Sequence, residues 1–356
     1  MPRRVALPLA LVALALLTPG CPVAPDDDDT PTYPDLPLYD FEAAAPWFAC
    51  PDEADFPDEV TVATVYDAAS QDFGDPNTRD LEATVELPTG DFAQIGLWLQ
   101  LDCPAGPGGC DDWDRAGSLQ LALDASAPPE AREWLELARH VTPYNRGMCQ
   151  YIDVTPLASL LQGNRLFTSH VDTWVAPAWL VTARLVYTPG RPVVSEVINV
   201  WGHRTITVGN VAPDANVDAQ IEPVTVRIPA DARRVRAHLI TTGHGFGHSG
   251  NCAEFCGMEH AVVVNGEEHV WSGWRDDCDQ NPVSPQAGTW EYGRNGWCPG
   301  AIAVGKVMNV LDSVTPGQDA TIDLDIRLGN GAEYNNQQPV DGAPFTRVSL
   351  KLYIER

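Results

Sequence analysis

The chain has 356 residues, with 49 aspartates and glutamates against 22 lysines and arginines, and a formal net charge of −27. Nucleic acids and anionic membrane surfaces repel such a chain, so neither is expected as a partner, and we interpret the charge as an aid to solubility. The length exceeds what one hydrophobic core usually holds, which favours two domains.

Residues 1–21 have the pattern of a signal peptide. Two arginines precede the apolar run 6–17, which is too short to span a bilayer, and a small residue follows before Cys21. This order is typical of a bacterial lipoprotein cleavage site, although Thr18 stands where Leu or Val is usual, and plain secretion is the alternative. Residues 22–40, rich in Pro and Asp, are expected to form a disordered tether. We therefore expect a protein exported to the bacterial cell envelope (outer surface or periplasm) or secreted, which contacts a membrane only through this anchor.

The remaining chain has the alternation of apolar and polar residues that half-buried strands require. Gly, Pro and Asp clusters separate these segments, and the clearest are 60–66, 81–87, 95–101, 237–242, 260–264, 320–327 and 347–354. Asn265-Gly266 follows one of them and predicts a tight hairpin turn. Many short strands with frequent turns favour an all-β fold of sandwiches or jelly rolls.

One segment, 155–163, predicts a helix, because Thr155 can cap it, Pro156 suits its first turn and Gly163 can end it. A Pro/Gly break at 187–192 marks a domain boundary. We therefore predict an N-terminal domain over 41–190 and a C-terminal domain over 191–356.

The nine cysteines suit an exported, oxidised protein. If Cys21 carries a lipid, eight remain for four disulfides. Proximity along the chain predicts Cys103–Cys110, Cys252–Cys256 and Cys278–Cys298, which leaves Cys50 and Cys149 to pair across a long loop.

Asp111, Asp112 and Asp114 directly follow the loop between the first of these cysteine pairs, and Trp113 and Arg115 lie among them. A solvated acidic loop is the simplest interpretation, and calcium binding is another, although the EF-hand spacing is absent. A disulfide before the acids and an arginine after them favour a third interpretation, in which an ionised carboxylate orients water or acts as a base.

Eleven tryptophans are present, and most are expected in the core because tryptophan buries a large area. An exposed one offers a flat face to a sugar ring, and Trp113 and Trp174 are the strongest candidates. His244 and His248 lie four apart in a glycine-rich stretch near Glu254 and Glu259. They favour a flexible substrate-contacting loop over a metal site, because the glycines argue against a helix that would align them.

At these motifs the chain resembles the bacterial secreted peptide-N-glycosidase F family, the glycoamidases that remove N-linked glycans from asparagine. The matching segments follow one another in order over residues 90–310. They are Cys103…Cys110-Asp-Asp-Trp-Asp-Arg115, Arg139-His-Val-Thr-Pro-Tyr144, Ile152-Asp-Val-Thr155, Asp172-Thr-Trp174, Cys252-Ala-Glu-Phe-Cys256 and Arg294-Asn-Gly-Trp-Cys-Pro-Gly300. The resemblance implies two consecutive antiparallel jelly-roll domains packed side by side, with the site in a groove between them.

The resemblance also implies roles for single residues. Asp114 matches the principal catalytic acid, and Glu254 matches a supporting glutamate held between two cysteines. Asp172 stands where the family has a third acid, a glutamate. The matching substrate-binding residues are Arg115, Arg294, Trp113 and Trp174, together with His244 and His248 in an altered loop.

The resemblance implies hydrolysis of the amide between asparagine and N-acetylglucosamine in N-glycosylated proteins or peptides, without metal or organic cofactor. A monomer is expected. The main alternative is a surface glycan-binding lipoprotein of the same fold with weak or no turnover, which the change at Asp172 and the altered histidine loop favour. A copper monooxygenase with two similar β domains is a third hypothesis. Its copper sites need clustered His and Met ligands, and the sequence, which has only four methionines, shows no such cluster.

Overall fold

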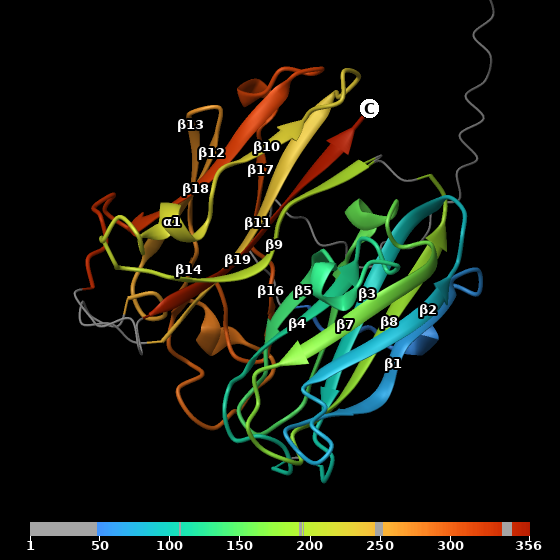
Figure 1. Ribbon diagram of the computed structural model, residues 1–356. Coiled ribbons are helices and arrows are strands. Elements are labelled where there is room, and N and C mark those ends of the chain that lie inside the picture. Colours follow the sequence, from blue (N-terminus) through green and yellow to red (C-terminus); the bar gives the residue numbers. More distant parts are fainter. Residues whose placement is uncertain (1–47, 107, 192–193, 195, 246–251, 337–343) are drawn as a thin grey trace, which may run out of the picture. The chain divides into compact units, whose positions relative to one another are not determined.

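The computed structural model describes residues 48–106, 108–191, 194, 196–245, 252–336 and 344–356, which belong to one compact unit (Figure 1). Antiparallel strands dominate these residues, and the single α-helix among them is the short α1 (Val217–Gln220). None of the helices in the described ranges has the length and apolar character needed to cross a membrane. The 3-10 helices are Glu53–Asp55, Pro129–Ala131, Thr155–Leu157, Cys278–Gln280 and Leu311–Ser313. The predicted all-β fold class is confirmed.

The first sandwich consists of two antiparallel sheets with one hydrophobic core between them (Figure 1, blue to green, with β16 in orange). One sheet has the order β1 (Thr61–Gln71), β8 (Trp179–Pro189), β3 (Phe92–Asp102) and β6 (Met148–Asp153). The other has the order β16 (Ala301–Ala303), β5 (Trp134–Val141), β4 (Ala116–Ala122), β7 (Gly163–Val171) and β2 (Asp80–Leu87). The core draws fully buried side chains from both sheets, among them Leu97, Leu119, Phe167 and Trp179.

The second sandwich repeats this plan (Figure 1, yellow to red). One sheet has the order β17 (Lys306–Asn309), β11 (Arg234–His244), β19 (Phe345–Glu355) and β9 (Glu196–Thr207). The other has the order β10 (Val224–Arg227), β18 (Asp319–Leu328), β12 (Met258–Val264) and β13 (Glu267–Ser272). A small two-stranded sheet, β14 (Trp274–Arg275) with β15 (Arg294–Asn295), lies outside them.

Six of the seven strands predicted from alternation lie within observed strands, and the seventh, 60–66, starts one residue before β1. The predicted turn is also present: Val264 pairs with Glu267, and Asn265 and Gly266 both have positive φ, at 51° and 87°. Glycine and asparagine tolerate this conformation best, so the local sequence fixes the β12–β13 hairpin and its register.

The predicted helix at 155–163 is wrong beyond its first turn. Only Thr155–Leu157 is helical, as a 3-10 turn, and Gly163 already begins β7. The Thr155 hydroxyl accepts a hydrogen bond from the backbone N–H of Ile95 at 2.9 Å, which ties the segment to β3. Leu157 and Leu161 are buried in the core. So short a segment cannot form a stable helix by propensity alone, and here packing selects a tight turn.

All four predicted disulfides are present: Cys50–Cys149, Cys103–Cys110, Cys252–Cys256 and Cys278–Cys298. Three of them close short loops, and the first joins residues 99 positions apart. The loops that carry the candidate acids are therefore covalently constrained where they leave the strands.

The chain returns to the first sandwich late in the sequence. β16 pairs with β5, so that Ala301–Ala303 extends a sheet whose other strands all precede residue 172. The break at 187–192 falls between β8 and β9. The domain limits 41–190 and 191–356 stay a prediction, and β16 shows that a segment after residue 191 adds a strand to the first sandwich.

A buried ionic cluster joins the sandwiches, which we call the Glu136 cluster (Glu136, Arg139, Ser349 and Lys351). Arg139 donates to both carboxylate oxygens of Glu136, from Nε at 2.9 Å and from Nη2 at 2.6 Å. The Ser349 hydroxyl donates to the same carboxylate, and the Lys351 ammonium donates to the backbone carbonyl of Glu136. This cluster fixes β5 against β19, and so fixes the loops of one sandwich relative to those of the other.

Candidate active site

The acidic loop after Cys110 is held by Asp111. This side chain is buried and accepts two hydrogen bonds from Arg115, from Nε at 2.8 Å and from Nη2 at 3.2 Å. It also accepts from the Trp113 backbone N–H at 3.0 Å and from the Thr173 hydroxyl at 2.7 Å. Asp111 is therefore a structural residue that sets the positions of its neighbours, while Asp112 is exposed.

Trp113 and Trp174 are among the most exposed large side chains of the described residues, at 61% and 57%. The Arg115 guanidinium lies 5.1 Å from the ring centroid of Trp174, within range of a cation–π interaction. Because Asp111 fixes Arg115, it also supports the orientation of Trp174, whose side chain stays largely exposed to solvent.

Glu254 lies in the loop between β11 and β12, between the bonded cysteines Cys252 and Cys256. Its Oε2 accepts a hydrogen bond from the Gly245 backbone N–H at 3.1 Å, and its backbone carbonyl accepts from the Asn295 N–H at 2.9 Å. The side chain is only 13% exposed. The disulfide and these bonds hold an acid in a nearly dry position.

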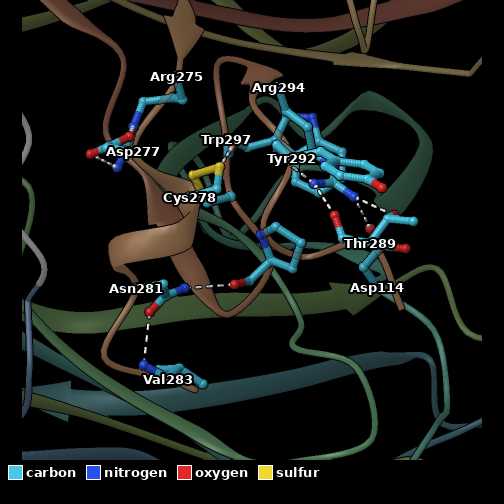
Figure 2. Close-up of a disulfide and its surroundings, with 12 residues drawn as sticks. Asp114, Arg275, Asp277, Cys278, Asn281, Val283, Thr289, Tyr292, Arg294 and Trp297 are labelled. Atoms are coloured by element: carbon cyan, nitrogen blue, oxygen red, sulfur yellow. Dashed lines mark hydrogen bonds and ion pairs between the residues drawn. A yellow bond between two sulfur atoms is a disulfide. The ribbon is translucent and has the colours of Figure 1, made fainter. Parts of the chain in front are cut away.

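Arg294, on β15, is fully buried, and Figure 2 shows its side chain beside Thr289 and Asp114. Its Nη1 donates to the carbonyls of Thr289 and Tyr292 at 2.9 and 2.8 Å, and its Nη2 donates to the Thr289 hydroxyl at 2.9 Å. Its guanidinium carbon lies 5.1 Å from the Phe255 ring and 4.8 Å from the Trp297 ring. Carbonyl oxygens and aromatic rings therefore hold this cation rigidly in place.

Arg294 brings together the two principal acids that the resemblance implies. Its Nη2 lies 3.7 Å from Oδ2 of Asp114, and its Nε lies 3.4 Å from Oε1 of Glu254. Asp114 comes from the loop before β4, and Glu254 comes from the loop after β11. One buried cation thus faces a carboxylate from each sandwich.

Both carboxyls hold their protons more tightly than usual. Burial raises the pKa of Asp114, although a hydrogen bond from Tyr144 and the charge of Arg294 oppose the shift. Burial also raises the pKa of Glu254 to about 7, where Arg294 lowers it and the neighbouring charge of Asp114 raises it further. The pair therefore includes a carboxyl, Glu254, that is close to its midpoint at neutral pH, which suits proton transfer in both directions.

Tyr144 is a member of this cluster that was not assigned a role from the sequence, although it closes the Arg139–Tyr144 motif. Its hydroxyl lies 3.2 Å from the Thr289 hydroxyl and accepts from Arg294 Nη2 at 3.4 Å. Burial and the charge of Asp114 raise its pKa to about 12, so it stays protonated and can donate to Asp114.

Asp172 lies in a separate ion pair. Its Oδ1 is 2.8 Å from Nε2 of His170, and its Oδ2 accepts from Arg347. Burial would raise its pKa, but the hydrogen bond from His170 and the interactions with Arg347 hold the pKa well below its usual range. Both oxygens therefore have donors already, and within the described ranges no hydrogen bond or ion pair joins Asp172 to Asp114, Arg294 or Glu254.

His244, at the end of β11, packs between aromatic rings. Its ring centroid lies 5.3 Å from those of Trp297 and Phe345, and its Nε2 is 2.9 Å from the Thr242 hydroxyl. Burial and the charges of two nearby arginines keep its pKa well below the usual value, so the ring is neutral. His248 and Cys21 lie outside the described residues, and their roles stay predictions.

Comparisons with known proteins agree with this arrangement. Residues 212–340 match the family model described as peptide-N-glycosidase F, C terminal. A curated relative from Elizabethkingia miricola, peptide-N(4)-(N-acetyl-β-D-glucosaminyl)asparagine amidase F, is 28% identical over 280 residues, which cover 73% of this chain and 75% of the relative.

Solved structures give the same picture of the fold. Recombinant peptide:N-glycanase F superposes with a TM-score of 0.72 at 21% identity, and the match covers 84% of this chain and 96% of the solved chain. The structure of PNGF-II superposes with a TM-score of 0.66 at 18% identity, over 83% of this chain and 65% of its own. The chain therefore resembles the peptide-N-glycosidase F family and has the two-sandwich fold of these structures.

Proposed function

We propose that the protein hydrolyses the amide between asparagine and N-acetylglucosamine of N-glycosylated proteins or peptides. The observation that carries this proposal is the buried Arg294, which faces Asp114 and Glu254 from two constrained loops. The relative's name gives the reaction, and the acids at this cation supply groups suited to it.

Asp114 acts as the base. Its carboxylate takes a proton from the attacking water, and the oxygen of that water bonds to the amide carbonyl carbon. Negative charge then develops on the carbonyl oxygen, and a rigid guanidinium in a dry site stabilises such charge strongly. Arg294 is the candidate, and we assign it the role of a fixed positive charge, because its buried guanidinium lies 3.7 Å from Asp114 and 3.4 Å from Glu254.

Glu254 supplies the proton that the leaving nitrogen needs when the C–N bond breaks. Its pKa of about 7 keeps part of the population protonated at neutral pH. The products are an aspartate-bearing peptide and a glycosylamine. Trp113 and Trp174 offer open ring faces for the sugar, and Asp111 holds Arg115 in position beneath Trp174.

Mass spectrometry of an N-glycopeptide incubated with the purified protein tests the reaction. Wild type should release the glycan and convert asparagine to aspartate, and in ¹⁸O-labelled water one labelled oxygen should enter the new carboxyl. Asp114→Ala should abolish product, whereas the adjacent, exposed Asp112→Ala is the matched control and should leave turnover near wild type. Full activity in the Asp114 variant would disprove its assignment.

A glycan-binding protein without turnover is the second candidate. The observation that favours it is Asp172, whose two carboxylate oxygens are already paired with His170 and Arg347. Under this alternative the same experiment returns unchanged glycopeptide, while calorimetry still detects binding of the glycan.

Export rests on the sequence pattern alone, and we propose it together with lipid attachment at Cys21. Expression of the full chain in a bacterial host with radiolabelled palmitate should label the wild type and leave Cys21→Ser unlabelled. A label that persists in the variant would contradict the anchor.

A further inference from the structure

Exposed aromatic side chains gather around the acid cluster. Among the described residues, five aromatic side chains count as exposed: Phe73, Trp113, Trp174, Trp274 and Tyr292. Trp113 precedes Asp114, Trp274 pairs with the strand residue beside Arg294, and the Tyr292 carbonyl accepts from Arg294. Phe73 has no such direct link and reaches the site only through a chain of stacked groups.

This chain of stacked groups, which we call the aromatic ladder, consists of Arg115, Trp174, Arg79 and Phe73. The guanidinium carbon of Arg115 lies 5.1 Å from the Trp174 ring, and that of Arg79 lies 5.9 Å from the same ring. Arg79 lies 4.6 Å from the Phe73 ring. The Phe73 backbone N–H donates to the Val175 carbonyl at 2.9 Å, which joins the loop after β1 to the loop after β7.

Arg79 differs from the other arginine of the ladder. Arg115 is neutralised by Asp111, whereas no ion pair of Arg79 is found among the described residues. Its Nε is buried and has no hydrogen-bond partner there. Arg79 is therefore a half-buried guanidinium beside two exposed aromatic rings, and it forms no ion pair with any described residue in a chain of net charge −27.

We propose that the outer part of the aromatic ladder, Phe73, Arg79 and Trp174, is a subsite for a carboxylate-bearing sugar of the glycan. Such a sugar has both groups that the ladder recognises: a ring whose C–H face stacks on Trp174 or Phe73, and a carboxylate that pairs with Arg79. A neutral sugar would use only the rings, and an acidic peptide side chain would use only the cation. The proposal rests on the proposed function for its substrate class.

Contacts between neighbouring side chains connect Arg79 to the acids. Arg115 is covalently next to Asp114, and the ladder leads from it through Trp174 to Phe73 in steps of 4.6 to 5.9 Å. Arg79 is thus connected to Asp114 through Trp174 and Arg115 rather than by a contact of its own, so we assign it to a sugar other than the one at the acids. An acidic protein repels acidic glycans, and an unpaired arginine at this place offsets that repulsion.

Binding measurements in the Asp114→Ala background, where no turnover is expected, test the subsite directly. Isothermal titration compares one sialylated N-glycopeptide with the same glycopeptide after enzymatic desialylation, at low salt. The background protein should bind the sialylated form about tenfold more tightly, as expected for one charge-assisted pair that is partly exposed. Arg79→Gln should remove this preference, and Arg79→Lys should retain only part of it because lysine lacks the planar fork.

Arg233→Gln is the matched control, because it removes one charge from an exposed arginine of the other sandwich and should keep the tenfold preference. A preference that survives Arg79→Gln, or equal binding of the two glycopeptides to the background protein, would overturn the subsite. Hydrolysis of the desialylated glycopeptide by wild type is measured in parallel. Equal binding with normal hydrolysis overturns the subsite alone, whereas neither binding nor hydrolysis overturns the proposed function as well.

Discussion

Two buried acid–arginine groups in this protein use the same residue types and give opposite electrostatic results. In the Glu136 cluster, Arg139 donates to both oxygens of the carboxylate, and the Ser349 hydroxyl donates as well. Burial alone would raise the pKa of Glu136, but the charges and hydrogen bonds of Arg139 and His203 hold it well below the usual value. This carboxylate stays ionised and fixes one sandwich against the other.

At the candidate active site, the arginine donates elsewhere. Arg294 directs Nη1 and Nη2 to Thr289 and Tyr292, and approaches Asp114 and Glu254 only to 3.7 and 3.4 Å. Burial raises the pKa of each carboxyl, and the charge of Arg294, which lies near both acids, offsets only part of this rise. The number of donors on the carboxylate, rather than the presence of an arginine, decides whether a buried acid is a structural ion or a proton carrier.

The largest expected effect is on catalysis. Asp114→Asn should lower kcat/KM for an N-glycopeptide by at least about 10³-fold, because it removes the base but keeps the shape of the side chain. Urea denaturation should show no loss of stability, since ionised Asp114 is buried at a cost. A variant with near-normal kcat/KM would show that the site does not act through this acid.

The next effect is on stability. Glu136→Gln should lower the free energy of unfolding by about 3 to 5 kcal/mol, because it leaves the fully buried Arg139 without its counter-charge. The exposed Glu133→Gln, three residues away on the chain, is the control and should change stability by less than about 0.5 kcal/mol. Equal urea midpoints for the two variants would contradict the structural role of the Glu136 cluster.

The ionisation of Glu254 makes the stability of the protein depend on pH. Its pKa rises from 4.5 to about 7 on folding, so the folded state binds its proton more tightly than the unfolded state. The resulting stability is complete below pH 4.5 and is lost as pH rises through 7. Between these values wild type should lose about 3 kcal/mol more than Glu254→Gln, whose amide does not titrate. Parallel stability profiles for the two proteins would contradict the raised pKa.

The smallest effect concerns the open rings. Trp113→Ala should raise KM for glycopeptide by about three- to tenfold and leave the melting temperature unchanged, because a ring that is 61% exposed contributes stacking to the sugar but little packing. Trp179→Ala, which removes a fully buried ring, should instead destabilise the fold by about 3 to 5 kcal/mol. Unchanged KM in Trp113→Ala would remove this residue from the substrate surface.

Local patterns in the sequence predicted the strands and the turn well, because side-chain alternation and positive φ are short-range properties. Asn265-Gly266 determines its own turn, whereas Thr155–Leu157 shows the limit, since contacts with Ile95 and the core decided its form. The late return of β16 to the first sandwich has no local signal at all, because pairing with β5 bridges about 160 positions.

Some residues of the candidate site were predicted from the sequence, and others were found only in the structure. Family resemblance selected Asp114, Glu254 and Arg294, and the structure places them together, although their roles stay proposals. Tyr144 was missed as a partner of Asp114, because its motif was noted without a reason to assign its hydroxyl a role. Arg79 lies in a segment with little resemblance to the family, and only three-dimensional stacking connects it to the site.

The most direct test of the shared-arginine account is a pH titration of the Glu254 carboxyl by ¹³C NMR, with Glu254→Gln used to assign the signal. A midpoint near pH 7 is the predicted result, because burial raises the pKa of Glu254 and the charge of Arg294 offsets this only in part. A midpoint at or below about 4.5, the ordinary value for a glutamate, would show that Glu254 is a fully paired ion like Glu136 and does not carry a proton for the reaction.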